Sequence, residues 1–108
     1  MIDKSLLVAF QEARALIEHG WTKGAHARAS SNEGVHPNDP RAIKYCLVGA
    51  LHHVSTHKVG YMSLRNRVEL ALDNADLVSW NDSQESKLPV LAVLDKIIKQ
   101  LEPLVNNA

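Results

Sequence analysis

Apolar residues recur at helical spacing through most of this chain. Between Ser5 and Glu18 they fall three and four positions apart, and charged residues occupy the opposite face. This pattern indicates an amphipathic helix rather than a strand. Gly20 follows closely, at a place where a residue in the left-handed conformation commonly ends a helix. The sequence therefore predicts a first helix over residues 5–18.

A second helix is predicted from Asp39-Pro40 to about Val54. Aspartate is a favoured N-cap, and proline suits the first helical position. Residues 45–51 carry no charge on any face, so this helix is expected to be buried on most sides, at the centre of the domain. Gly49 lies in its interior, where a small residue suits a close crossing by another helix.

Two further helices follow. Ser63 is the predicted cap of the third, and the fourth is predicted from about Leu88 to Glu102-Pro103. Between them, Trp80-Asn81-Asp82 has the character of an irregular junction. Because no repeat or second domain is visible, we predict an all-α fold. It is a compact bundle of about four helices in a single α-helical domain, residues 1–108.

One long loop separates the first two predicted helices. Residues 22–39 show no periodicity and are rich in Gly, Ala, Ser, Asn, His and Pro. Connections of this length in compact domains commonly carry function. We therefore expect a binding site to involve this loop.

Composition argues against several functions. The chain has 12 basic and 12 acidic side chains, so its net charge is zero. Nucleic-acid binding rests on a positive face that neutralises phosphates, so we do not expect a nucleic-acid partner. The single cysteine cannot form an intramolecular disulfide, and neither a signal peptide nor an apolar run of membrane-spanning length is visible. These features predict a cytoplasmic protein with no membrane association.

Three short islands stand out from the helical background. They are Gly20 to Arg28, Cys46 to Leu51 and Trp80-Asn81-Asp82, and they hold both tryptophans and the only cysteine. Such clustering favours a shared pocket or a tightly specified junction. A tryptophan can stack on a planar group while arginines meet negative charge, so the islands suit a small anionic ligand. The candidate ligand-binding residues are Trp21, Lys23, His26, Arg28, Arg41, Trp80 and Asp82.

The same residues also suit purely structural roles. Trp21 fits a core plug after the first helix. Arg28 is suited to pinning the loop, through Asp39, Asp82 or a main-chain carbonyl. Asn81 and Asp82 are common capping and turn residues. The sequence leaves the structural and the ligand-binding interpretations open.

A cysteine enzyme is one alternative. Cys46 would be the nucleophile, and a loop histidine, His26 or His36, would be its base. In the middle of the predicted helix, among apolar residues, Cys46 is better interpreted as a small core hydrophobe. No catalytic residue is therefore predicted.

A histidine-rich metal site is another alternative. His53 and His57 have the i,i+4 spacing that can place two imidazoles on one ion, and a loop histidine with Glu33 or Asp39 would have to complete the set. A structural zinc site wants four ligands, often several of them cysteines. We therefore predict neither metal ligands nor a cofactor.

The islands, taken in order, resemble a family of small uncharacterised bacterial and phage domains. Its members carry a helix ending in Gly-Trp, a Gly-x-x-Ala-Arg element, an Asp-Pro-x-Ala segment, a Cys-x-x-Gly-Ala-Leu helix and a Trp-Asn-Asp junction. The matching residues here are Gly20-Trp21, Gly24 to Arg28, Asp39-Pro40-Arg41-Ala42, Cys46 to Leu51 and Trp80-Asn81-Asp82. The resemblance implies an α-helical domain of bacterial or phage type, and it implies no activity. It also implies that five residues belong to one shared feature: Trp21, Arg28, Cys46, Trp80 and Asp82.

We therefore predict a non-catalytic binding or regulatory module of bacterial or phage type. It would recognise a partner protein or a small anionic ligand through loop 21–41 and the Trp80 junction. A homodimer is a further alternative, in which the apolar stripe from Val90 to Leu101 packs on a second copy.

Overall fold

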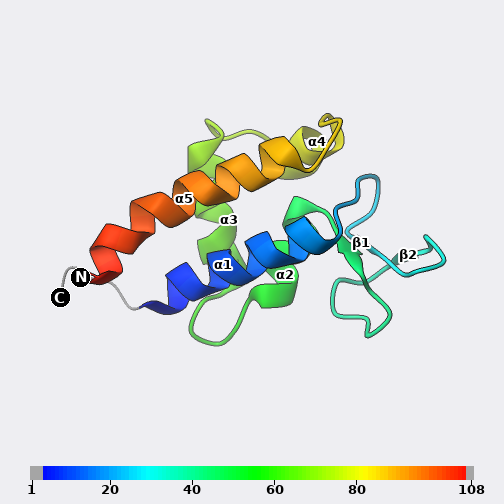
Figure 1. Ribbon diagram of the computed structural model, residues 1–108, viewed down its shortest axis with the longest axis horizontal. Coiled ribbons are helices and arrows are strands. Elements are labelled where there is room, and N and C mark those ends of the chain that lie inside the picture. Colours follow the sequence, from blue (N-terminus) through cyan, green and yellow to red (C-terminus); the bar gives the residue numbers. More distant parts are fainter. Residues whose placement is uncertain (1–3, 107–108) are drawn as a thin grey trace.

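Five helices and one small sheet make up residues 4–106, the part of the chain that the computed structural model describes. In chain order the elements are α1 (Lys4–His19), β1 (Ala27–Arg28), β2 (Gly34–Val35), β3 (Lys44–Tyr45), α2 (Leu47–Val54), α3 (Tyr61–Ala71), α4 (Leu77–Asp82) and α5 (Leu88–Asn106). Helices α1 and α5 run side by side along the long axis of the molecule, and the strands lie beyond the end of α1 (Figure 1). None of these helices is both long enough and apolar enough to cross a membrane.

The core lies between α1, α2 and α5. Helix α1 confirms the first predicted helix, and its apolar stripe packs against both of the others. Fully buried apolar side chains from the three helices include Phe10, Ala13, Ile17, Leu47, Ala50, Leu51, Val90, Leu94 and Leu101. The α5 stripe that the sequence suggested as a dimer surface is thus largely covered by α1 within one chain. Helix α5 also continues through Pro103 instead of ending there.

The prediction of an all-α bundle of about four helices is wrong. Part of the segment between α1 and α2 folds into a three-stranded sheet in the order β2-β1-β3, with both pairs antiparallel. Ala27 in the central strand pairs with Val35 on one side and Tyr45 on the other. Trp21 adds an isolated parallel bridge to Tyr45. Each strand is two residues long, too short for the alternation that reveals strands in a sequence.

The predicted central helix is shorter than expected, because α2 begins at Leu47 and not at Asp39-Pro40. The Asp39 carboxylate does accept a main-chain hydrogen bond, from the nitrogen of Arg41 at 2.8 Å, but within a turn. Such local bonds offer the backbone an alternative to the helix. The nitrogen of Ile43 then donates to the carbonyl of Arg28, which draws the following residues into the sheet.

Cys46 is the N-cap of α2 and not a residue in the middle of a helix. Its Sγ accepts a hydrogen bond from the nitrogen of Gly49 at 3.3 Å, and its main-chain nitrogen donates to the carbonyl of His26. The main chain at His26 therefore packs closely against Gly49, in the place where the sequence predicted a crossing helix.

The two later helix starts also differ from the prediction. Gly60, rather than Ser63, is the N-cap of α3. Trp80-Asn81-Asp82 lies inside the short helix α4, which Asp76 caps by accepting a hydrogen bond from the nitrogen of Val78.

Candidate functional site

Asn81 joins α4 to two distant segments of the chain. Its side chain is fully buried. Oδ1 accepts hydrogen bonds from the indole nitrogen of Trp21 at 2.9 Å and from the main-chain nitrogen of Leu47 at 3.1 Å. Nδ2 donates to the carbonyl of Thr22 at 3.2 Å. One amide therefore holds the segment after α1 and the start of α2 in fixed positions.

Asp82 and Lys23 extend this connection at the surface. The Asp82 carboxylate accepts hydrogen bonds from the nitrogen of Gly24 and from Nδ2 of Asn81, both at 3.1 Å. Gly24 has a φ of +79°, a conformation that favours glycine. Nζ of Lys23 donates to the carbonyl of Gln84 at 2.8 Å. The loop and the Trp80 junction thus meet, as the sequence suggested.

The guanidinium group of Arg28 points back into its own loop. Nε donates to the hydroxyl of Thr22 at 2.8 Å, and the terminal nitrogens donate to the carbonyls of Lys23 and Asn32 at 3.0 and 2.9 Å. All three acceptors are neutral oxygens of residues 22–32. These contacts are those of a loop-pinning arginine.

Two of the candidate residues, Arg41 and Trp80, do not take part in the hydrogen bonds described above around Asn81. Arg41 forms salt bridges with Asp39 at 3.0 Å and Glu33 at 3.7 Å, and its side chain is 60% exposed. The Arg41 guanidinium lowers the pKa of the Asp39 carboxyl through a direct hydrogen bond. Trp80 is half-buried against the core.

Two adjoining hollows open beside the Asn81 connection. One has a volume of about 250 Å³ and lies among Gly24, His26, Cys46 and Asp82. The other has a volume of about 240 Å³ and is bordered by His26, His52, Tyr61, Arg65 and Asp76. His26 borders both, so this candidate residue stands between them.

Aromatic rings form one wall of the second hollow. The rings of His52 and Tyr61 stack with centroids 3.7 Å apart and planes 7° from parallel. The ring of His26 lies 6.5 Å from that of His52. Helix α3 therefore brings Tyr61 and Arg65, one turn apart, to the hollow together.

Burial and nearby basic side chains together set the electrostatics of His52. Burial lowers the pKa of His52, and three nearby basic side chains lower it further. These are His26, His36 and Arg65. A carboxylate of Asp76 also borders the hollow, but it already accepts hydrogen bonds from the nitrogen of Val78 and the hydroxyl of Ser79. The side chains that border the hollow therefore include two imidazoles and one guanidinium group, from His26, His52 and Arg65.

The candidate ligand-binding residues predicted from the sequence do not include His52, Tyr61 or Arg65. The i,i+4 spacing of Tyr61 and Arg65 places them on one helix face, which is the only signal for them in the sequence. Their approach to His26 depends on how α2 and α3 pack, and no local pattern reports that.

The chemistry of Cys46 does not favour a nucleophile. The residue is only 2% exposed, and burial raises the pKa of its thiol. A reactive cysteine needs the opposite, a thiolate stabilised at ordinary pH. The position of Cys46 at the start of a helix, beside His26, does not offset its burial.

The histidine pair suggested for a metal does not share a helix. Helix α2 ends at Val54, so His53 lies in its last turn while His57 lies in the connection that follows. Nδ1 of His53 is 2.9 Å from the carbonyl oxygen of Pro37. Across residues 4–106, no three side chains of His, Cys, Asp or Glu gather closely enough to hold a metal ion.

Fold and site together define a small, mostly helical domain in which hydrogen bonds hold the loop after α1 against α4, beside two small hollows. The chain belongs to a family of unknown function (DUF6197), whose pattern matches residues 1–100. No curated protein matches the chain, and neither does any solved structure.

Proposed function

We propose that this protein is a non-catalytic binding module of bacterial or phage type, acting in the cytoplasm, and that it binds a small anionic ligand. The proposed site is the hollow between His26, His52 and Arg65. A partner protein that presents an acidic side chain would use the same groups and is the alternative. The observation that carries the proposal is that His26, His52 and Arg65 gather around one hollow, where the bordering carboxylate of Asp76 caps a helix.

The hydrogen bonds around Asn81 support this site indirectly. They hold residues 22–24 against α4, and the carbonyl of His26 is tied to the nitrogen of Cys46. The imidazole of His26 is thereby placed at the edge of the hollow before any ligand binds. Such preorganisation reduces the entropy that binding costs. Trp21 and Arg28 thus act as positioning residues in the proposal.

Arg65 is the residue expected to meet the negative charge. Its Nε donates to Glu69 at 3.2 Å, an i,i+4 pair that orients the guanidinium group along α3. Guanidinium groups suit oxyanions because their planar donors match the spacing of the oxygens.

Replacing Arg65 with glutamine is expected to weaken binding of sulfate, used as a probe, by about fivefold. Sulfate titrations followed by two-dimensional amide NMR would measure this. Arg67→Gln, on the same helix but beside α5, is the matched control and should change the affinity less than twofold. Absence of saturable sulfate binding to the native protein, or equal weakening in both variants, would contradict the proposal.

Sulfate affinity is also expected to rise as the pH falls. The pKa of His52 is lowered in the free protein, so its ring is neutral near pH 7. An anion favours the charged ring and raises that pKa, so binding takes up a proton. Binding therefore strengthens as the pH falls through the raised pKa of the bound state, and it levels off below the lowered pKa of the free protein. Sulfate keeps a constant charge over this range, which leaves the protein as the source of the effect. His52→Gln should flatten the pH profile; an unchanged profile would exclude His52 from the site.

A further inference from the structure

A larger hollow lies between the first half of α1 and the connection from α2 to α3. Its volume is about 460 Å³, within the range of small-molecule sites. It meets α2 only at Val54, the last residue of that helix, whereas the proposed anion site borders Val48 and His52. The two are therefore separate places on the molecule.

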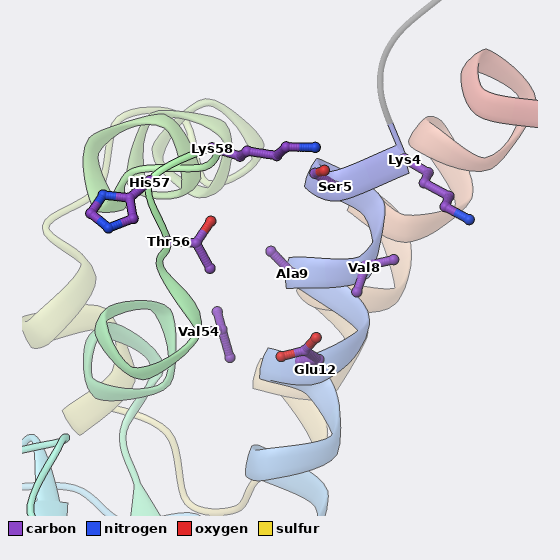
Figure 2. A pocket seen from close by; sticks show the side chains of 9 residues that line it. All are labelled: Lys4, Ser5, Val8, Ala9, Glu12, Val54, Thr56, His57 and Lys58. Atoms are coloured by element: carbon purple, nitrogen blue, oxygen red, sulfur yellow. The ribbon is translucent and has the colours of Figure 1, made fainter.

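The walls of this hollow are mainly apolar. Figure 2 shows Ala9 on α1 facing Val54 and Thr56 across the gap. Val8 also borders it and is 39% exposed, a high value for a large apolar side chain. A second hollow of about 360 Å³ adjoins the first, shares Lys58 with it, and is bordered by Leu6 and Val59. An apolar ligand body would cover this surface and remove it from water.

Charge around the opening favours a single negative group. Among the described residues, Lys4 and Lys58 border the hollow, against one acidic residue, Glu12, and the Lys4 side chain points away from the gap in Figure 2. In Figure 2 the side chain of Lys58 extends across one end of the opening toward α1, while Glu12 lies at the opposite end. Lys58 forms none of the ion pairs found among residues 4–106.

We propose that this hollow binds a small apolar carboxylate. The carboxylate lies on the ammonium of Lys58, and the apolar body lies against Ala9 and Val54. The position of Glu12 disfavours a ligand with a second negative charge at its far end.

Octanoate is the probe for this site, titrated into the full chain and followed by amide NMR. Saturable shifts are expected at Ala9, Val54 and Thr56, while those of His52 and Arg65 stay unchanged. Butyrate should bind at least about tenfold more weakly, because it buries four fewer methylene groups. The neutral 1-octanol should bind about fivefold more weakly than octanoate, as it lacks the charge that Lys58 meets.

Lys58→Gln is expected to weaken octanoate binding about fivefold, the range of a solvent-exposed ion pair. Lys99→Gln, an exposed lysine on α5, is the matched control and should bind like the native protein. Glu12→Gln should strengthen binding, the opposite direction. Because all three side chains are exposed, the variants are expected to keep the native melting temperature.

Several results would overturn the proposal. These are no saturable octanoate binding, equal affinity for octanoate and 1-octanol, and an unchanged affinity after Lys58→Gln. Shifts that fall on His52 and Arg65 instead would place the carboxylate in the anion site. That outcome would reject this second site and leave the first one standing.

Discussion

Replacing Gly49 with alanine is expected to destabilise the protein by about 3 kcal/mol or more. A Cβ atom built at Gly49 would lie 1.9 Å from the carbonyl oxygen of His26, far inside van der Waals contact. That oxygen cannot simply turn aside, since it accepts the hydrogen bond from the nitrogen of Cys46 at the start of α2. The main chain at His26 or the helix itself would have to move.

Helix propensity alone would predict the opposite result, namely that Gly49→Ala stabilises the protein. In a helix interior exposed to solvent, glycine to alanine stabilises by about 1 kcal/mol. Gly60→Ala is the matched control, because nothing lies within 4 Å of its Cβ position. There the gain from a stiffer unfolded chain opposes the loss of a favoured cap residue, so the change should stay within about 1 kcal/mol of zero. Urea unfolding of both variants would measure the difference; a Gly49→Ala protein as stable as the native one would contradict the close contact.

Replacing Asn81 with alanine is expected to lower the free energy of unfolding by about 3 kcal/mol. The change leaves two buried groups without their partner, the main-chain nitrogen of Leu47 and the carbonyl of Thr22, and it also leaves the part-buried indole nitrogen of Trp21 unpaired. Each unmet buried group costs about 1–3 kcal/mol, and water entering the vacated space recovers part of that cost. Chemical denaturation would give the free energy, and tryptophan fluorescence would report the altered surroundings of Trp21.

Asn38→Ala provides the control for Asn81. Asn38 is exposed in the turn after β2, and its substitution should change stability by less than about 0.5 kcal/mol. Equal effects of the two substitutions would show that the buried amide is not the point that holds the three segments together. A large effect of Asn81→Ala would show that the buried amide stabilises the loop in the absence of a ligand. The hydrogen bonds of Trp21 to Asn81 and of Arg28 to its own loop agree with this structural role.

The two long helices were readable from the sequence because their information is local. In α1 and α5 the apolar residues repeat with the helical period over many turns, and each stripe identifies the buried face without reference to the rest of the chain. The meeting of the loop with the Trp80 junction was also anticipated, since the unusual residues gather in both. The sequence indicates only a capping or turn role for Asn81, whose amide lies at the centre of that contact.

The sheet, the start of α2 and the contents of the hollows were decided by tertiary structure. Strands of two residues carry no period, and at Asp39-Pro40 the local capping signal competes with long-range pairing to Arg28. Pairing prevails there because residues 43–45 gain main-chain partners in the sheet. The sequence by itself therefore determined the amphipathic helices and the place where the chain is most specialised. Only the packing of α2, α3 and α4 decided that His26, His52 and Arg65 share a hollow, because residues far apart in a chain meet through long-range contacts that no local pattern records.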